Sequence, residues 1–197
     1  MANRRHKTLV YTADMSQSEQ KIIRKAAAGD RMAFRELVLE HSHAMFRLAL
    51  RMTCDESAAE DIVQEVFIKA WRNIGKFKME SGFRTWLHRI AVNTAMDYLR
   101  KQTSRRRYEA AEPDWERVQE HGEVGREDVR IDIRAQTQEA MMNLSDIERS
   151  ALLLRHYEGH SIQEIAQILE LTTSGSKQAV FRAVKKMRIA LRPLVTA

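Results

Sequence analysis

The sequence contains few of the residues that interrupt helices and almost none that form disulfides. Its 197 residues include only 7 glycines and 2 prolines, a composition that favours an all-helical protein. Cys54 is the single cysteine, which excludes an internal disulfide and a zinc site built from several cysteines, and which fits a reducing compartment. No apolar run approaches the ~18–20 residues of a membrane span, and the N-terminus lacks the apolar core of a signal peptide. We therefore expect a soluble protein of the cytoplasm.

Basic side chains exceed acidic ones. The chain has 33 Lys and Arg against 27 Asp and Glu, which gives a net charge of +6. This excess favours a polyanionic partner without identifying it. A hydrophobic content of 44% in 197 residues is enough for one core or two small ones.

Serine and glutamate residues three positions apart predict helix starts. In such a pair the serine hydroxyl accepts from the third helical N–H, while the glutamate accepts from the serine N–H. An apolar pattern of helical period follows each of the pairs Ser16/Glu19, Ser57/Glu60, Ser145/Glu148 and Ser161/Glu164. We expect helices near residues 18–28, from Asp30 to about residue 52, and over 58–74 and 83–101. No repeat and no strand-like alternation appears.

The composition changes after the fourth expected helix. Residues 109–128 hold eight acidic side chains against two basic ones, together with Pro113, Gly122 and Gly125. Weak periodicity in this segment predicts a linker that is flexible or only partly helical. We expect two small helical domains, at 16–104 and 133–197, joined by a linker over 105–132 and preceded by an extension over 1–15.

The segment from Ser161 to Arg192 has the pattern of a helix-turn-helix. A short apolar helix is followed by a turn and then by a helix with six basic residues and no acidic one. Packing of the two apolar faces would leave the second helix free to present cations to phosphates and base edges. A helical hairpin with a solvated basic face is the alternative.

Three motifs, in this order, resemble those of a bacterial RNA polymerase sigma factor of the extracytoplasmic-function group. They are AEDIVQEVFIKAW (59–71), FRTWLHRIAVNTAMDYLRK (83–101) and SIQEIAQIL…KQAVFRAVKKMR (161–188). The resemblance covers nearly the whole chain and implies sigma domains two and four, core RNA polymerase and promoter DNA as partners, and no catalysis or cofactor. It also implies an anti-sigma factor as a partner, bound between the two domains. An autonomous helix-turn-helix regulator with an N-terminal dimerisation domain is the alternative function.

The resemblance implies that the helix over 58–74 binds the clamp helices of the largest polymerase subunit, with the flap as a further contact of the chain. On this helix, the polar side chains away from the apolar stripe form the candidate contact to the clamp, namely Asp61, Gln64, Glu65 and Arg72. Carboxylates and amides can pair with arginines on a partner helix. A merely solvated helix face is the alternative for these residues.

Basic and aromatic side chains alternate around the start of the helix over 83–101, a mixture that suits single-stranded DNA. The candidate contacts to the minus-ten element, whose location follows from the resemblance, are Phe77, Phe83, Arg84, Trp86, Arg89, Asn93 and Arg100. The asparagine amide can donate to and accept from a base edge. Alternatively, Phe83 and Trp86 belong to the core, and Asn93 is a polar surface residue.

The basic C-terminal helix carries the candidate contacts to the minus-thirty-five element. They are Ser174, Lys177, Gln178, Phe181, Arg182 and Lys185. Gln178 and Arg182 can form bidentate contacts to adenine and guanine. The turn departs from the commonest family pattern, Pro followed by Gly-Thr-Val, because it reads Thr-Thr-Ser-Gly-Ser; Ser174 is then the expected helix cap.

Metal and redox chemistry have little support. His41 falls on an apolar helix face, and Gly159 interrupts the turn between His156 and His160, so we expect no metal site. Cys54 lies beside two acids, which oppose a lowered thiol pKa, so an ordinary interdomain cysteine is favoured over an oxidant sensor.

Overall fold

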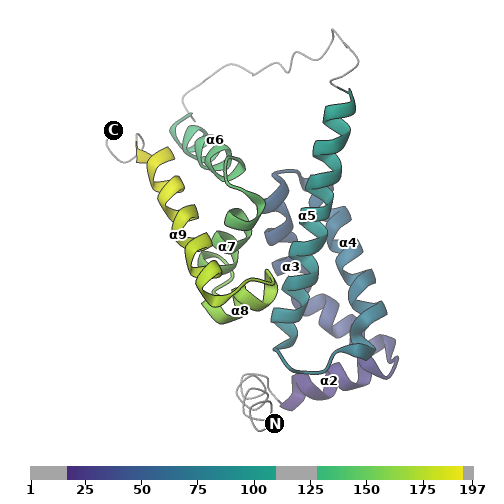
Figure 1. Ribbon diagram of the computed structural model, residues 1–197. Helices are drawn as coiled ribbons and strands as arrows, with labels where there is room; N and C mark the ends of the chain where they lie inside the picture. Colours follow the sequence, from purple (N-terminus) through teal and green to yellow (C-terminus); the bar gives the residue numbers. More distant parts are fainter. Residues whose placement is uncertain (1–16, 110–127, 193–197) are drawn as a thin grey trace.

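The structure, a computed structural model, describes residues 17–109 and 128–192, with side chains described for 17–105 and 135–192. Within these ranges every regular element is a helix, so the predicted all-α fold is confirmed (Figure 1). No helix of the described residues is both long and apolar enough to cross a membrane. The expected N-terminal extension, the Ser16 cap and the middle of the expected linker lie outside the described residues.

The first domain consists of four α-helices and a short 3₁₀ turn. They are α2 (Gln17–Ala27), α3 (Arg31–Thr53), α4 (Glu56–Asn73), η1 (Ile74–Lys76) and α5 (Phe83–Glu109). As predicted, Asp30 caps α3, because its carboxylate accepts from the N–H groups of Met32 and Ala33. The predicted Ser57 cap of α4 is wrong. Asp55 is extended and accepts from the N–H of Ala58, so α4 begins two residues earlier than expected.

The second domain consists of α6 (Asp128–Met142), α7 (Asp146–His156), α8 (Ile162–Ile168) and α9 (Thr173–Ala190). Both predicted capping boxes, Ser145/Glu148 and Ser161/Glu164, are present in full. Ser174 does not cap α9, contrary to the prediction. Thr172 does so, because its hydroxyl accepts from the N–H of Gly175, which leaves Ser174 within the first turn.

The helices enter the expected linker from both sides. α5 continues past Lys101 to Glu109, and α6 already begins at Asp128. In Figure 1, α5 rises beyond the rest of the first domain, and the helices of the second domain lie to one side of α3 and α5. The domains contact one another, chiefly α8 against α5 and α7 against α3.

Each domain has apolar side chains that are fully buried. In the first domain they include Ile23, Leu37, Met45, Leu48, Met52 and Leu87, and in the second Leu153, Leu154, Ile165 and Ile168. Burial of one such side chain stabilises the fold by ~1.5–3 kcal/mol. Trp71 of α4 is 36% exposed and packs against Phe34 with a ring-centroid distance of 4.9 Å. The buried residues therefore hold α4, α5 and α9 in place while leaving one face of each helix uncovered by core.

Candidate nucleic-acid interface

The polar edge predicted on α4 is accessible. Asp61, Gln64 and Arg72 are exposed, and the Glu65 side chain is 45% exposed. Gln64 and Glu65 follow Asp61 by three and four residues, about one turn, and Arg72 follows Glu65 by seven residues, about two turns, so the four lie along one side of the helix. Oε1 of Glu65 lies 3.5 Å from Nζ of Lys69, four residues further on. An exposed pair of this kind holds a carboxylate in position without removing it from solvent.

The basic and polar residues predicted on α5 lie at its surface, and part of that surface contacts the second domain. Asn93 is exposed, and Arg100 is exposed with Nη1 3.7 Å from Oδ1 of Asp97. Arg84 and Arg89 are each about half exposed. Arg89 pairs with Glu170 of the turn between α8 and α9, and Arg84 donates to the carbonyl oxygen of Glu158.

The aromatic residues expected to contact DNA form one cluster, and Phe83 is at its buried end. The Phe83 ring is 1% exposed, and its centroid lies 5.3 Å from that of His41 and 5.5 Å from that of Trp86. A DNA base could reach it in this conformation only by displacing core side chains, which fits the alternative that Phe83 belongs to the core. Phe77 and Trp86 are half-buried, and their rings are tilted by 38° with centroids 5.1 Å apart. Both rings are therefore partly exposed.

The predicted recognition residues share the exposed face of α9. They are Ser174, Lys177, Gln178, Phe181, Arg182 and Lys185, all exposed. Phe181 is 68% exposed, so its ring is available for contact with a partner. The opposite face buries Ser176, Ala179 and Ala183 against α7 and α8. The structure thus brings the predicted residues together on one uncovered face.

One residue of that face is held by a buried carboxylate that the sequence analysis missed. Glu148 is 4% exposed, with Oε1 3.3 Å from Nε of Arg182 and Oε2 2.6 Å from Nζ of Lys186. Burial would raise the Glu148 pKa, but hydrogen bonds from Lys186 and Ser145 and the Lys186 charge lower it below its usual value. Glu148 therefore stays ionised and positions two cations of α9.

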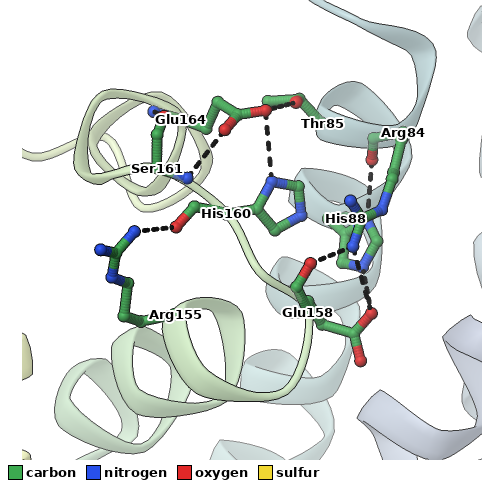
Figure 2. A network of polar contacts seen from close by, with 8 residues as sticks. All are labelled: Arg84, Thr85, His88, Arg155, Glu158, His160, Ser161 and Glu164. Carbon is green, nitrogen blue, oxygen red and sulfur yellow. Dashed lines mark hydrogen bonds and ion pairs between the residues drawn. The ribbon is translucent and has the colours of Figure 1, made fainter.

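A polar network between the domains also escaped the sequence analysis (Figure 2). His88 of α5 is fully buried, and its Nδ1–H donates to the carbonyl oxygen of Arg84 at 2.8 Å, while its Nε2 lies 3.2 Å from Oε2 of Glu158. The ring of His160, 1% exposed, meets that of His88 edge-on with centroids 4.6 Å apart. The hydroxyl of Thr85 donates to Oε1 of Glu164 at 3.0 Å. These partners are 70 to 79 residues apart in sequence, so no local pattern could reveal them.

Burial sets the ionisation of this network. It lowers the pKa of His160 to about 4, aided by the positive charges of His88 and Arg84 and opposed by Glu164. Nδ1 of His160 lies 3.4 Å from Oε1 of Glu164, but neither ring nitrogen has a hydrogen bond of good geometry. Burial also acts on Glu164, yet hydrogen bonds from Ser161 and Thr85 lower its pKa to about 2. A neutral imidazole therefore lies among ionised carboxylates.

A buried arginine joins the domains at a second place. Arg149 of α7 is 4% exposed and donates from Nη1 to the carbonyl oxygen of Met52 at 2.7 Å. Its Nε donates to the carbonyl of Met141 at 3.0 Å, and Nη2 to those of Met142 and Leu144. The acceptors lie at the C-terminal ends of α3 and α6, where free carbonyl groups favour a cation. The guanidinium is satisfied without a carboxylate.

Cys54 and the histidines form no site of their own. Cys54 is the C-cap of α3 with φ 58°, and it lines a cavity of about 450 Å³ between α3 and α6. Burial raises its thiol pKa, which opposes thiolate chemistry. Among residues 17–105 and 135–192, no group of three His, Cys, Asp or Glu side chains is arranged to hold a metal ion.

Comparison with known proteins gives the family. Residues 37–105 match Sigma-70 region 2, and residues 134–187 match Sigma-70 region 4. The chain belongs to the sigma factors of bacterial RNA polymerase, in the extracytoplasmic-function group, whose members direct the polymerase to promoters to initiate transcription. This family is not known for enzymatic activity.

Individual relatives match over nearly their full length. The chain is 32% identical to the RNA polymerase sigma-H factor of Pseudomonas aeruginosa over 192 residues, covering 91% of this chain and 96% of the relative. It is 33% identical to the ECF RNA polymerase sigma-E factor of Haemophilus influenzae over 193 residues, covering 90% and 97%.

Two solved structures share the fold at 23% identity. CnrH, in complex with the cytosolic domain of CnrY, aligns with a TM-score of 0.67 over 90% of this chain and 99% of that chain. The sigma factor RpoE of Bartonella quintana, in complex with the anti-sigma factor NepR, aligns with a TM-score of 0.64 over 81% and 96%.

Proposed function

We propose that this sigma factor binds core RNA polymerase through α4 and reads the two promoter elements through α5 and α9. The observation that supports it most is the set of exposed polar side chains on each of these three helices, within regions that match Sigma-70 regions 2 and 4. In this proposal each domain reads a short element, and the polymerase holds the domains at a suitable separation.

The polymerase contact is the exposed edge of α4. Asp61, Gln64, Glu65 and Arg72 offer carboxylate, amide and guanidinium groups that can pair with charged residues of the clamp helices. Trp71 and Ile68, both partly exposed on the same helix, add apolar area. Directional polar contacts around a small apolar centre are typical of a specific but reversible interface.

The minus-ten contact extends from Phe77 and Trp86 along α5 to Asn93 and Arg100. Half-buried rings beside cations suit DNA that has been opened, because unstacked bases need platforms and phosphates need positive charge. Removing a base from the duplex costs a few kcal/mol, which a pocket must offset. Phe83 supports this surface from beneath.

The minus-thirty-five contact is the exposed face of α9 in a duplex major groove. Gln178 and Arg182 are the candidates for base edges, and Phe181 for a thymine methyl. Lys177 and Lys185 are candidates for phosphates, which supply affinity without sequence. Glu148 fixes the direction of Arg182 in this arrangement.

The proposal includes an anti-sigma partner and action in the cytoplasm, where the polymerase is. CnrH and the Bartonella quintana factor, which share this fold, were both solved in complexes, the latter with an anti-sigma factor. The exposed α4 edge and α9 face are surfaces that an inhibitor can cover. Pull-down from uninduced cells tests the partner, and recovery of polymerase subunits alone as stoichiometric partners contradicts it.

Binding to duplex promoter DNA, with and without core polymerase, tests the proposed function against an autonomous regulator. The free chain is expected to bind poorly at physiological salt and to gain sequence preference only with core enzyme. Tight sequence-specific binding by the free chain in a gel shift supports the autonomous regulator instead.

A further inference from the structure

A cavity of about 450 Å³ lies where the C-terminal end of α3 meets α6 and the residue that ends α7. Its walls include Arg47 and Arg51 of α3, the α3 cap Cys54, Gln138 of α6, and Tyr157. These five residues lie outside the surfaces assigned above to polymerase and DNA. Sites for small molecules typically have volumes of ~300–1,000 Å³. The cavity therefore has the size of a small-molecule site.

The walls of the cavity are tied together by the buried Arg149. Its Nη1 donates to the carbonyl oxygen of Met52, near the C-terminal end of α3, at 2.7 Å. Its Nε donates to the carbonyl oxygen of Met141, near the C-terminal end of α6, at 3.0 Å. These two hydrogen bonds hold α3 and α6 in place beside the cavity. A ligand would therefore meet a shape that exists before it binds, which lowers the entropic cost of binding.

Two guanidinium groups line the cavity without a carboxylate to neutralise them. Arg47 and Arg51 are four residues apart on α3, so their side chains are neighbours on one side of the helix. Among the side chains that the structure describes, no Asp or Glu pairs with either of them. The Arg51 guanidinium lies over the Tyr157 ring, 4.4 Å from its centroid, and Arg47 contacts Nδ1 of His43. These contacts orient two positive charges and leave both uncompensated.

The rest of the wall is uncharged. Leu50 and Met141 supply apolar surface, and the Gln138 amide can both donate and accept. Burial raises the pKa of the Cys54 thiol, which keeps it neutral. An anion held by the two arginines would thus have apolar surface beside its uncharged part. A phosphate monoester matches neighbouring guanidinium groups best, because its three oxygens accept from their donors and carry ~1.5–2 negative charges at neutral pH.

We propose that this cavity binds a small organic phosphate. The phosphate lies against Arg47 and Arg51, and the apolar or aromatic part lies against Leu50 and Met141. Such a ligand contacts α3 of the first domain and α6 of the second, so by mass action it stabilises the arrangement in which these helices are side by side. The inference goes beyond the proposed function and does not rest on it.

Protection of Cys54 from alkylation tests the site. The thiol is half-buried in the cavity wall and is the single cysteine of the chain, so its reaction with N-ethylmaleimide reports on this cavity alone. Phenyl phosphate is the probe, inorganic phosphate has the charge without the ring, and phenol has the ring without the charge. Phenyl phosphate at about 1 mM is expected to halve the reaction rate. Each of the other two compounds is expected to need at least ~10-fold more for the same effect.

A charge-matched pair of variants assigns the protection to the two arginines. Arg47→Gln with Arg51→Gln is expected to need at least ~10-fold more phenyl phosphate for half protection, because the charge-assisted hydrogen bonds are lost. Arg31→Gln with Arg35→Gln makes the same change at exposed positions of the same spacing on α3 and is expected to behave as the unmutated chain. Rates with and without phenyl phosphate are compared within each variant, so that a change in the reactivity of the thiol itself cancels.

Thermal unfolding is the second readout. Phenyl phosphate is expected to raise the Tm of the unmutated chain and of the control, and to leave that of the Arg47, Arg51 variant unchanged. Absence of protection in the unmutated chain at about 10 mM phenyl phosphate overturns the site, as does equal protection in the two double variants. Equal protection by inorganic phosphate, or by phenol, overturns an organic phosphate as the ligand. These comparisons within the unmutated chain decide the question even if the variant fails to fold.

Discussion

Arg182, on the exposed face of α9, is held 3.3 Å from Glu148, a buried carboxylate that also completes the capping box of α7. One side chain thus stabilises a helix start and directs a candidate base-reading arginine. The two roles can be separated, because glutamine preserves the capping-box hydrogen bond and removes the charge.

Glu148→Gln is expected to lower the free energy of unfolding by only about 1 kcal/mol, because its partners Arg182 and Lys186 are half exposed. Glu148→Ala is expected to lower it by about 2 kcal/mol, because the capping-box hydrogen bond is lost as well. Both variants are expected to reduce discrimination at the minus-thirty-five element. Chemical denaturation and transcription from altered promoters measure the two effects. Unchanged discrimination in Glu148→Gln contradicts the positioning role, and Glu139→Gln is the matched control.

Asn93→Ala and Arg182→Ala are expected to affect different promoter elements. Asn93 lies on α5 and Arg182 on α9, so each change removes a contact to one element, at a cost of about 1–3 kcal/mol if a base contact is lost. Transcription with core polymerase from promoters altered separately at each element is the measurement. Equal losses on both promoter sets would show that the two residues act structurally.

Gln64→Ala with Glu65→Ala is expected to weaken binding to core polymerase while changing the free energy of unfolding by less than about 0.5 kcal/mol. The reason is that both side chains project into solvent and the Glu65–Lys69 pair is exposed. Competition for core enzyme against the unmutated chain gives the result. Glu36→Ala, exposed on α3, is the control, and equal competition by the double variant places the interface elsewhere.

Phe83→Ala is expected to destabilise the first domain by about 3–5 kcal/mol, because its fully buried ring supports Phe77, Trp86 and His41. Trp86→Ala, at a half-buried site, is expected to cost less stability and more promoter opening. Thermal unfolding measures the stability of each variant, and a permanganate footprint of melted DNA measures promoter opening. A Phe83→Ala chain that keeps its stability but opens promoters poorly supports direct contact between Phe83 and DNA instead.

Lower pH is expected to weaken the contact between the domains. The His160 ring faces His88 and Arg84 of α5 and Glu164 of α8, while Arg155 donates to its backbone carbonyl and Glu158 binds the neighbouring His88. Its pKa is about 4 when buried and about 6.5 when exposed, so its contribution is complete above about pH 6.5 and falls as the exposed form takes up a proton. Glu164, with a pKa of about 2, and Glu158, whose pKa is also lowered, act in the same direction, but below about pH 4.5.

From about pH 7.5 to about pH 5, the contact between the domains is expected to weaken by on the order of 2 kcal/mol through His160. The distance between spin labels at Glu60→Cys on α4 and Ile189→Cys on α9, in a Cys54→Ser background, reports the change. His160→Gln is expected to remove most of the pH dependence in this range. A contact between the domains that is equally stable at both pH values contradicts the role given to His160.

Local signals in the sequence predict the helices, and long-range contacts decide the features in which the structure differs from those predictions. The capping boxes at Ser145 and Ser161 require only neighbours three residues apart, and both predictions are confirmed. The cap of α4 falls on Asp55 instead of Ser57 because two competent acceptors lie close together and the turn after Cys54 selects the first. Whether Phe83 faces DNA or the core depends on His41 and Trp86 packing around it, which periodicity alone does not encode. The network of His88, Glu158 and His160 joins α5 to the segment between α7 and α8, at least 70 residues further along the chain, and only folding brings them together.

Run-off transcription with purified core polymerase over a library of promoters tests the central claim most directly. The account predicts that core enzyme alone yields no promoter-directed transcript, and that adding this chain yields transcripts from templates sharing one pair of minus-ten and minus-thirty-five sequences. Loss of those transcripts with the Gln64→Ala, Glu65→Ala variant would tie the activity to α4. Absence of promoter-directed transcripts with folded chain and active core enzyme contradicts the account.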